Sequence, residues 1–194
     1  MEPLRFPESK RSARAKAFDI IKQRSFFRTK IKLVSGKESD FYIDLKPTMF
    51  HPEGAWLLSQ LIFERLKKEK IDYVGGLAVG AVPLLSPLNV LSYTEGHPIP
   101  AFFVRQTAKD HGTKKILEGL ASGDELQGKS VAILDDVTTT GGSALIAVKA
   151  AQAAGAKVIL VLAIVDREEG AVETFAKEDV RFEALFTAGE FLRS

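Results

Sequence analysis

Apolar residues along this chain occur in short runs that alternate with stretches of helical periodicity. From Pro52 onward, apolar side chains recur at the spacing of one helical face, and a proline suits the first turn of such a helix. Residues 157–165 are almost continuously apolar, which is typical of a strand in a parallel sheet covered on both faces. Further strands are predicted at residues 71–74, 99–104, 131–134 and 181–186, and further helices at 82–94 and 144–154. The pattern predicts an α/β fold with a mainly parallel central sheet flanked by helices.

The first 45 or so residues depart from this alternation. They predict a helix at residues 9–27 and two strands at residues 30–34 and 40–45, joined by a polar turn that contains glycine. We expect this segment, together with the C-terminal residues, to form a hood over the sheet. A length of 194 residues suits one domain, so we expect residues 1–194 to form a single unit. Residues 105–121 are polar and lack clear periodicity, which indicates a long loop.

The composition narrows the classes of site and partner. The chain contains no cysteine, so it can form neither disulfides nor thiolate metal sites, which fits a reducing compartment. Its formal net charge of +2 is too small to indicate nucleic-acid binding. The first residues lack the apolar segment of a secretory signal, and no apolar stretch approaches the roughly 18 residues of a membrane span. We therefore expect a cytoplasmic protein without nucleic-acid or membrane partners.

An acidic pair follows the predicted strand at 131–134. Asp135 and Asp136 come at its carboxyl end, where open α/β sheets bind ligands. Residues 137–143 are then small, hydroxyl-bearing or glycine, and amide groups at the start of the next helix favour an anion such as phosphate. Carboxylates repel phosphate, so the acids suit vicinal sugar hydroxyls or a bound Mg²⁺. The stretch therefore indicates a site for a phosphorylated ribose. The alternative, a plain helix cap with two solvated aspartates, does not need so long a run of hydroxyls and glycines.

A second phosphate-site pattern occurs at residues 123–130, which match the Walker A motif letter for letter. A true P-loop follows a strand and opens a helix, whereas this stretch precedes the strand that begins near Val131. We therefore predict a surface turn there.

The stretch from Val131 to Ser143 resembles the signature of the type I phosphoribosyltransferases, which bind phosphoribosyl pyrophosphate (PRPP). The resemblance implies the type I phosphoribosyltransferase fold with an N-terminal hood. It places the two acids on the ribose hydroxyls and the turn on the 5′-phosphate. The residues that we expect to bind PRPP are Arg105, Lys109, His111, Asp135, Asp136, Val137, Thr138, Thr139, Thr140, Gly141, Gly142 and Ser143.

A basic stretch at residues 104–115 starts at the end of a predicted strand. By itself it could be a solvated loop, but a pyrophosphate leaving group needs positive charge nearby. The segment Ala-Lys-Asp-His-Gly within it resembles the mobile loop of the orotate phosphoribosyltransferases. The resemblance implies that Lys109 and His111 contact pyrophosphate in the neighbouring subunit of a homodimer, which would share the loop at 105–118. Together with Asp135 and Asp136, these two residues are the expected catalytic groups.

Two further stretches resemble the same family and concern the base. Residues 164–170 resemble its Asp-Arg segment, in which the arginine, here Arg167, pairs with the orotate carboxylate; a surface ion pair is the alternative. Residues 33–45 resemble the hairpin that covers the base. Tyr42 could line the orotate pocket or simply pack within the hood. Thr139 is also expected to contact orotate.

Three positions depart from the pattern of this family. Val34, Val79 and Gln106 stand where some or many members have a lysine, so each position lacks one cation of the usual phosphate shell. Lys46 could replace one of them. These departures affect individual contacts and leave the core signature intact.

The resemblance implies an orotate phosphoribosyltransferase. Such an enzyme converts orotate and PRPP to orotidine 5′-monophosphate and pyrophosphate in the de novo synthesis of UMP. It implies Mg²⁺ as the cofactor, carried by PRPP and not bound directly by the chain. Two alternatives remain: a transferase for another base, and a non-catalytic PRPP-binding regulator with the same fold.

Overall fold

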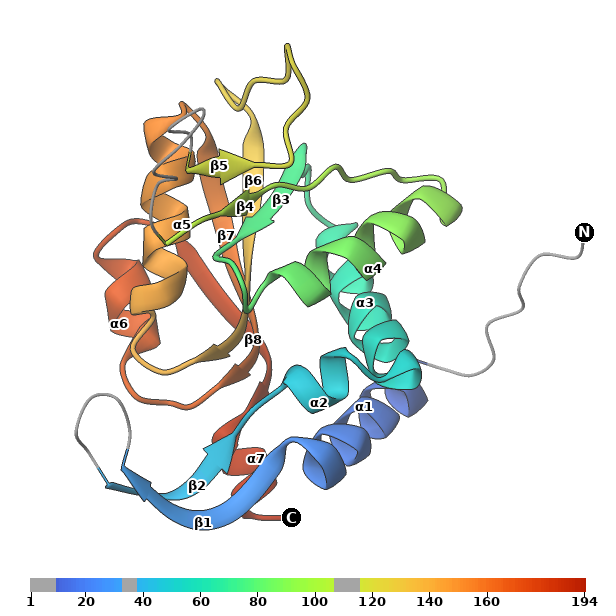
Figure 1. The fold of residues 1–194 in the computed structure, drawn as a ribbon, viewed down its shortest axis with the longest axis vertical. Coiled ribbons are helices and arrows are strands. Elements are labelled where there is room, and N and C mark those ends of the chain that lie inside the picture. The colour runs from blue at the N-terminus through green and yellow to red at the C-terminus, as the bar shows by residue number, and fades with distance from the viewer. Residues whose placement is uncertain (1–9, 33–37, 107–115) are drawn as a thin grey trace, which may run out of the picture.

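The computed structural model describes residues 10–32, 38–106 and 116–194, which form an open parallel sheet with helices on both faces (Figure 1). The strands of this sheet are ordered β3-β6-β7-β8, and each neighbouring pair is parallel. The elements in chain order are α1 (Lys10–Arg24), β1 (Phe26–Lys32), β2 (Glu38–Ile43), α2 (Lys46–Met49), α3 (Pro52–Leu66), β3 (Tyr73–Gly76), α4 (Val82–Thr94), β4 (Phe103–Val104), β5 (Leu117–Glu118), β6 (Ser130–Thr138), α5 (Gly142–Ala153), β7 (Lys157–Asp166), α6 (Ala171–Ala176), β8 (Arg181–Thr187) and α7 (Ala188–Leu192). The α/β architecture predicted from the sequence is confirmed.

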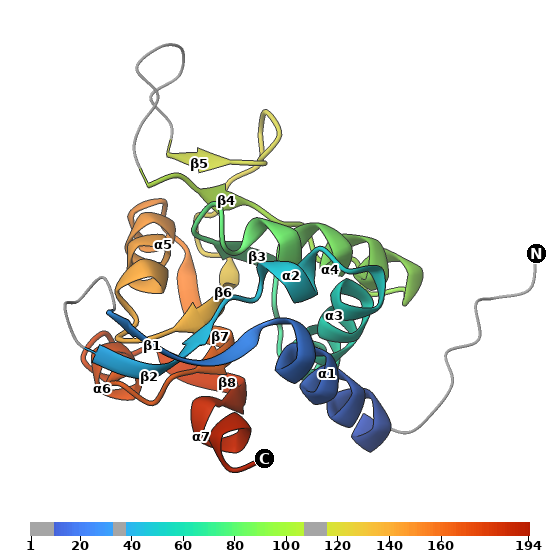
Figure 2. The same cartoon turned by 60° about the horizontal axis from the view of Figure 1, so that its bottom comes forward.

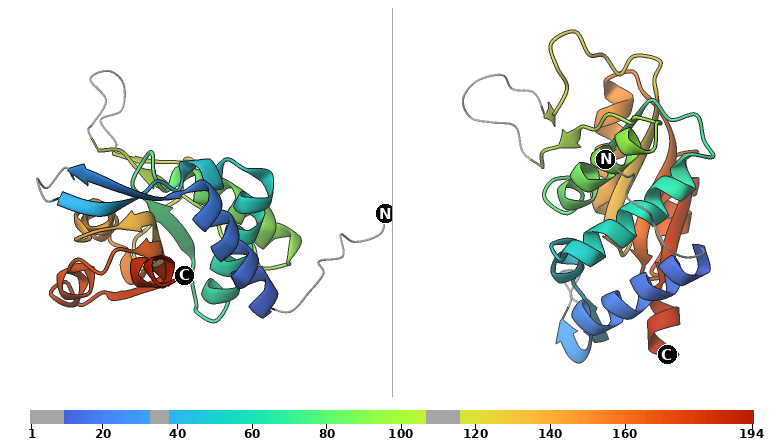
Figure 3. Two further views of the ribbon diagram at one scale, coloured as in Figure 1. Left: turned by 90° about the horizontal axis from the view of Figure 1, so that it is seen from below. Right: turned by 90° about the vertical axis from the view of Figure 1, so that its right-hand side faces the viewer.

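Strand β6 shows why the apolar runs of the sheet are continuous. Successive side chains of a strand point to opposite faces. Ala132 and Leu134 are buried in one cluster with α1, α3 and α4, whereas Val131 and Ile133 pack in a second cluster with α5. Figure 3 shows the two groups of helices on opposite sides of the sheet. Because both faces of β6 are covered, every position of the run must be apolar.

The hairpin β1–β2 lies across the end of the sheet toward which β6 and β7 run (Figure 1, Figure 2). Its strands are antiparallel, with Phe26 opposite Ile43 and Phe27 opposite Tyr42. Helix α7 lies beside the hairpin, and Phe191 of α7 stacks on Phe18 of α1 with ring centroids 4.4 Å apart. Both ends of the described chain therefore pack next to the hairpin. We refer to α1, β1, β2 and α7 as the hood.

The structure corrects several predicted boundaries, and the strands predicted at 30–34, 40–45 and 71–74 are shifted to 26–32, 38–43 and 73–76. Four further corrections are larger. The first helix ends at Arg24 rather than at residue 27, because the following aromatic residues, which favour strands, pair with β2 instead. The predicted strand at 99–104 is reduced to Phe103–Val104 and an isolated bridge between Ala101 and Val74. The predicted loop at 105–121 contains β5, which pairs with β4.

The fourth correction concerns the acidic pair. The strand predicted at 131–134 extends to Thr138, because its pairing with β7 continues past the apolar run as far as Asp166. Asp135 and Asp136 therefore lie within β6 and not beyond its end. Backbone hydrogen bonds to a neighbouring strand are independent of side-chain polarity, so the end of the apolar run does not mark the end of the strand.

The Walker-like stretch forms a turn ahead of β6. The amide of Lys129 donates to the carbonyl oxygen of Leu126, and Gly128 has a φ of 71°. Lys129 is exposed at the amino end of the strand, opposite to the end that carries the acids. Among the described residues, no helix is long and apolar enough to cross a membrane.

Candidate functional site

The acidic pair occupies the part of β6 nearest the hood. Alternation along the strand directs Asp135 to the α5 side and Asp136 to the opposite side. The two neighbouring carboxylates therefore have different surroundings, although they follow each other in the sequence.

Asp135 is buried and has one side-chain partner. Its Oδ2 accepts a hydrogen bond of 2.7 Å from Oγ1 of Thr138, and the residue is 6% exposed. Burial raises the pKa of Asp135 to about 7; the bond from Thr138 opposes this shift, and the charge of Asp136 adds to it. A positive charge or a hydroxyl donor placed beside this carboxyl group would stabilise its ionised form.

Asp136 lies beneath the glycine-rich turn that follows β3. A Cβ atom on Gly80 would lie 2.9 Å from Oδ1 of Asp136, so a side chain at this position would displace the carboxylate. Burial raises the pKa of Asp136, while backbone hydrogen bonds and the positive charge of Lys46 oppose the shift. The same turn contains a cis peptide bond between Ala78 and Val79.

Lys46, at the start of α2, lies on the Asp136 side of the acidic pair, and its positive charge acts on Asp136. Its Nζ donates to Oδ1 of Asp44 over 2.8 Å, and the side chain is 58% exposed. The hydrogen bond to Asp44 raises the pKa of Lys46, and the charge of Asp136 adds to the increase. Burial opposes ionisation of Asp44, but the hydrogen bonds and charge of Lys46 outweigh it and lower its pKa. Lys46 thus links the end of the hairpin to the acidic pair electrostatically.

The turn between β6 and α5 has the geometry of an anion cradle. Gly141 adopts a φ of 87°, and a Cβ there would lie 2.8 Å from Cε2 of Phe175. From α6, Thr174 supports the turn by donating its hydroxyl to the carbonyl oxygen of Thr140 over 2.7 Å. Gly142 and Ser143 are exposed at the start of α5, where no side chain caps the helix. The first amide groups of α5 are therefore directed toward the hood end of the sheet.

Arg167 is buried rather than exposed at the surface. It is 6% exposed, and its amide donates to the carbonyl oxygen of Thr138 over 2.9 Å, which places it beside the end of β6. Its Nε donates to Oε1 of Glu169 over 2.8 Å, and its Nη2 donates to Oγ of Ser39 over 3.1 Å. The ion pair of the alternative is present, with Glu169, but it does not lie at the open surface, because the arginine side chain is only 4% exposed.

Tyr42 lies on the outer side of the hairpin. It is 40% exposed and stacks on Phe27 with centroids 6.4 Å apart. Of the two roles predicted for Tyr42, packing within the hood is therefore observed. Its exposed face also leaves the ring accessible to a ligand.

The basic loop is described only at its two ends. Arg105 donates from its amide to the carbonyl oxygen of Ile116 and from Nη1 to Oε1 of Glu118, over 2.8 and 3.3 Å. It also lines a cavity of about 390 Å³ together with Ala78, Val79 and Gln106. Lys109 and His111 lie outside the described residues, as does Val34.

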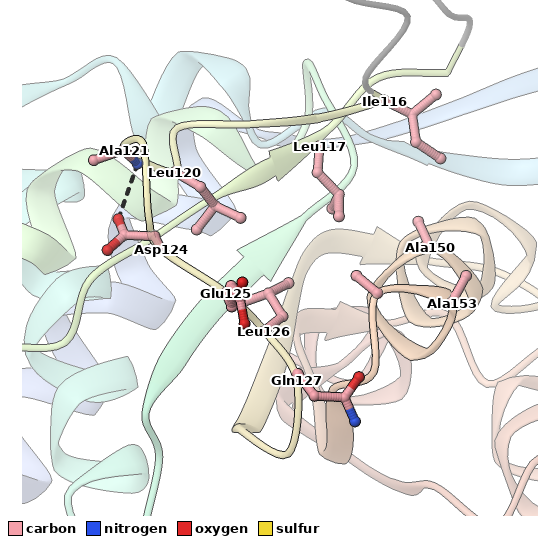
Figure 4. Close-up of a pocket in the computed structure, with 11 residues that line it drawn as sticks. Ile116, Leu117, Leu120, Ala121, Asp124, Glu125, Leu126, Gln127, Ala150 and Ala153 are labelled. Atoms are coloured by element: carbon pink, nitrogen blue, oxygen red, sulfur yellow. Dashed lines mark hydrogen bonds between the residues drawn. The ribbon is translucent and has the colours of Figure 1, made fainter.

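A larger cavity than the one beside Arg105 lies elsewhere in the described part of the chain. It has a volume of about 630 Å³ and is formed by residues 116–127 and the end of α5 (Figure 4). Apolar side chains such as Leu117, Leu120 and Ala150 line it, with Asp124 and Glu125 on the same loop. None of the predicted site residues contributes to it, so size alone does not identify the functional site.

Sequence reasoning missed several residues that shape the site. Ser39, Phe41 and Glu169 surround Arg167, and Asp44 holds Lys46. Only the pairing of acid and arginine within residues 164–170 could have suggested Glu169. Ser39, Phe41 and Asp44 reach Arg167 or Lys46 only because of where the hairpin packs. No local sequence pattern indicates that position.

Comparisons with known proteins agree with this site. The profile of the family described as phosphoribosyl transferase domain matches residues 50–186. An orotate phosphoribosyltransferase of Bradyrhizobium diazoefficiens is 53% identical over 96% of this chain and 100% of the relative, and one of Rhodopseudomonas palustris is 54% identical over the same shares. The crystal structure of Mycobacterium tuberculosis orotate phosphoribosyltransferase in complex with PRPP has a TM-score of 0.75 and 32% identity, covering 92% of this chain and 98% of the other.

The two relatives match nearly the whole chain, and the family profile covers residues 50–186, which contain both acids and Arg167. Adenine phosphoribosyltransferase from Leishmania tarentolae shares the fold, with a TM-score of 0.63 and 16% identity. The chain belongs to the phosphoribosyltransferase family, with the orotate phosphoribosyltransferases as its relatives along its length.

Proposed function

We propose that the chain transfers the 5-phosphoribosyl group of PRPP to orotate and releases pyrophosphate. The proposal rests on one observation: residues suited to a phosphorylated sugar and a residue suited to a carboxylate lie side by side at the hood end of the sheet. Asp135, Asp136 and the turn at 139–143 suit a phosphorylated sugar, and the buried Arg167 beside Thr138 suits a planar carboxylate. The names of the relatives, and PRPP in the complex of the M. tuberculosis protein, support the same substrates.

The turn would hold the 5′-phosphate through the amides at the start of α5 and the hydroxyls of Thr139, Thr140 and Ser143. The ribose would then lie against the acids, which accept hydrogen bonds from its hydroxyls. Arg105 would contribute to PRPP binding from the other side, next to the cavity at Val79. This positioning fixes the anomeric carbon relative to the base.

In the transfer, a ring nitrogen of orotate forms a bond to the anomeric carbon while the bond to pyrophosphate breaks. Positive charge develops on the ribose ring. Asp135 and Asp136 have raised pKa values in the free site, and a cationic ring beside them would favour their ionised forms. The pair would therefore bind the transition state more strongly than the substrate, which is the requirement for catalysis.

The leaving pyrophosphate carries negative charge, which Lys109 and His111 of the basic loop would stabilise. The described residues contain no group of three His, Asp or Glu side chains that could hold a metal ion together. The two diverging carboxylates suit an ion that arrives with PRPP better than one held by the chain. Mg²⁺ bound to the pyrophosphate would supply additional neutralisation of the leaving group.

Orotate would bind between the hairpin and the end of β6. Arg167 would contact its carboxylate, and Thr139 lies at the adjoining turn. Tyr42 faces the side of the hairpin opposite to Phe41, so a role for it in the pocket would require the ligand to extend around the hairpin. A base without a carboxylate would give no charged partner to the N–H groups of this buried guanidinium that Glu169 and Ser39 do not hold, and it would therefore bind more weakly. This discriminates against adenine, hypoxanthine and uracil.

A spectrophotometric assay tests the reaction. The loss of orotate absorbance is followed after addition of PRPP and Mg²⁺, with the three other bases as controls and with a chelator as the test of the metal. Turnover of orotate alone is expected. Consumption of another base would indicate a different transferase, and PRPP binding without any turnover would indicate a regulator.

A homodimer that shares the loop at 105–118 belongs to the same proposal. Apolar side chains exposed on α4 and near it support an interface there: Phe50 is 72%, Val79 71%, Val90 67% and Tyr93 76% exposed. Burying such a surface would stabilise a dimer. That the protein acts in the cytoplasm remains a prediction from its composition.

Subunit mixing tests the sharing of the loop. Lys109→Ala and Asp136→Ala are each expected to be almost inactive alone. If the loop of one subunit serves the site of the other, a mixed dimer contains one site with both residues intact, and activity returns on mixing. If each loop serves its own subunit, each site in the mixture lacks one residue and activity stays low.

A further inference from the structure

The guanidinium of Arg167 is held from three directions by residues that have no assigned role. Glu169 accepts from Nε over 2.8 Å, and Ser39 accepts from Nη2 over 3.1 Å. Cζ of the guanidinium lies over the ring of Phe41, 4.4 Å from the ring centroid. The arginine side chain is 4% exposed, so this contact is largely shielded from water.

The two hydrogen bonds engage Nε and Nη2 of the guanidinium. Nε and Nη2 form the edge nearest the side-chain stem, and Nη1 and Nη2 form the outer edge. Each Nη carries two N–H groups, so a carboxylate can bind Nη1 and the second N–H of Nη2 while Glu169 and Ser39 keep their own contacts. The protein contacts thus restrict the direction from which a ligand can bind.

Phe41 is itself fixed by a column of aromatic rings. It stacks on Phe26 at 5.9 Å, Phe26 stacks on Phe191 at 5.6 Å, and Phe191 stacks on Phe18 at 4.4 Å. The column runs from β2 through β1 to α7 and α1, and its last three rings are largely buried in the hood. A displacement of Phe41 would require repacking of these rings, because protein interiors are close-packed.

Alternation in β2 separates Phe41 from its neighbour. Phe41 faces inward to the guanidinium, whereas Tyr42 faces outward to Phe27. A ring over a guanidinium attracts it through the negative face of the π-system, and this attraction strengthens when water is excluded. The geometry therefore gives Phe41 an electrostatic function in addition to its packing.

We propose that Phe41 is a positioning residue for base binding: backed by the aromatic column, its ring sets the plane of the Arg167 guanidinium so that the outer edge receives the carboxylate of the base. This inference rests on the proposed function, in which Arg167 binds that carboxylate. Phe41 need not touch the base for this role.

Fluorination of the ring tests the electrostatic part without changing the fold. Phenylalanine with one, two or five fluorine atoms is incorporated at position 41, which progressively weakens the negative face of the ring. The KM for orotate is expected to rise with each step, by about 10-fold for the most fluorinated ring. The KM for PRPP and the melting temperature should stay within about twofold of those of the unmodified protein.

Phe182 provides a matched control. It stacks on Phe175 at 5.2 Å, in a part of the molecule distant in sequence from the hairpin, and no cation lies over it among the described contacts. The same fluorinated residues at position 182 should leave the KM for orotate unchanged. Fluorination at Phe26 alters the column one ring further from Arg167 and should have a much smaller effect than at Phe41.

The outcomes separate the inference from the proposed function. Arg167→Gln should abolish the discrimination in favour of orotate; if it leaves the KM for orotate unaltered, the role of Arg167 is wrong and the inference fails with it. If Arg167→Gln weakens orotate binding but fluorination at Phe41 has no effect, only the inference is overturned. A KM for PRPP that rises in parallel would show a general disturbance of the hood and also contradict it.

Discussion

The two halves of the site are built in different ways. The half for the sugar and phosphate comes from one continuous segment, from Asp135 to Ser143, at the junction of a strand and a helix. The half for the base joins Arg167 to Ser39, which is 128 residues away in the sequence. The first depends on the sheet, whereas the second exists only when the hood is packed over it. Binding of PRPP and binding of the base should therefore respond to different mutations.

The largest expected effect concerns the leaving group. Lys109→Ala should lower kcat by about 10²- to 10³-fold, because it removes positive charge that acts when pyrophosphate departs. The KM for orotate should change little, since Lys109 is not assigned to the base. Lys129→Ala, in the Walker-like turn, removes another lysine and should leave both constants unchanged. Steady-state kinetics would give kcat and the KM for orotate of the two variants for comparison. Full activity of Lys109→Ala would exclude the loop from the mechanism.

The base half is tested by Arg167→Lys. Lysine keeps the charge but cannot bind a carboxylate in two parallel hydrogen bonds, nor can it maintain the contacts of the inner edge. We expect the KM for orotate to rise by about 10- to 100-fold, while the Kd for PRPP measured by calorimetry stays nearly constant. Equal weakening of both ligands would show that the two halves are not independent.

The sugar half should show a pH dependence of stability. The pKa of Asp135 is raised to about 7 in the folded protein, so the free energy of unfolding should decrease as pH rises from about 4 through 7. Thr138→Val removes the hydrogen bond that favours the ionised carboxylate, and should cost about 2 kcal/mol more at pH 8 than at pH 4. Urea unfolding at both pH values measures this.

Asp135→Asn provides the control for this effect. Without a titrating group, the decrease attributed to Asp135 should disappear, and Thr138→Val should no longer have a pH-dependent cost in that background. If the variant that combines Asp135→Asn and Thr138→Val retains the pH dependence, another group is responsible. Asp136 is then the first to examine, because burial also raises its pKa.

The smallest effect separates backbone strain from the phosphate cradle. Gly141→Ala places a side chain at a φ of 87°, and Gly123→Ala does so at 96° in open space. Both should lose about 1 kcal/mol of stability from the strained backbone. Gly141→Ala also meets Phe175, so it alone should weaken PRPP binding by distorting the turn. Comparable losses of PRPP affinity in both variants would contradict a specific role of Gly141.

This difference between the halves also explains what could be predicted from the sequence. The segment from Val131 to Ser143 contains its strand, its ligand groups and its helix start in order, so the fold class and the sugar half followed from local patterns. The identity of Arg167 as a site residue came from a resemblance and not from periodicity. Its burial could not be predicted, because it depends on where the hairpin packs.

The same limit applies to individual boundaries. Strand β6 extends past its apolar run, since pairing with β7 continues through Asp135 and Asp136. The first helix ends before Phe26, because that ring joins the hairpin and the aromatic column. In both cases a tertiary partner determines the local conformation, and a single sequence does not show where that partner lies.

The aromatic column has a practical consequence for how this protein is handled. Phe191 lies in α7, and the hydroxyl of Ser194 donates to the carbonyl oxygen of Phe191 over 2.9 Å. An affinity tag or fusion partner attached after Ser194 would therefore begin next to a ring that supports Phe41. Recombinant versions that differ only in where the tag is attached should be compared for their response to orotate before kinetic constants are assigned to the enzyme.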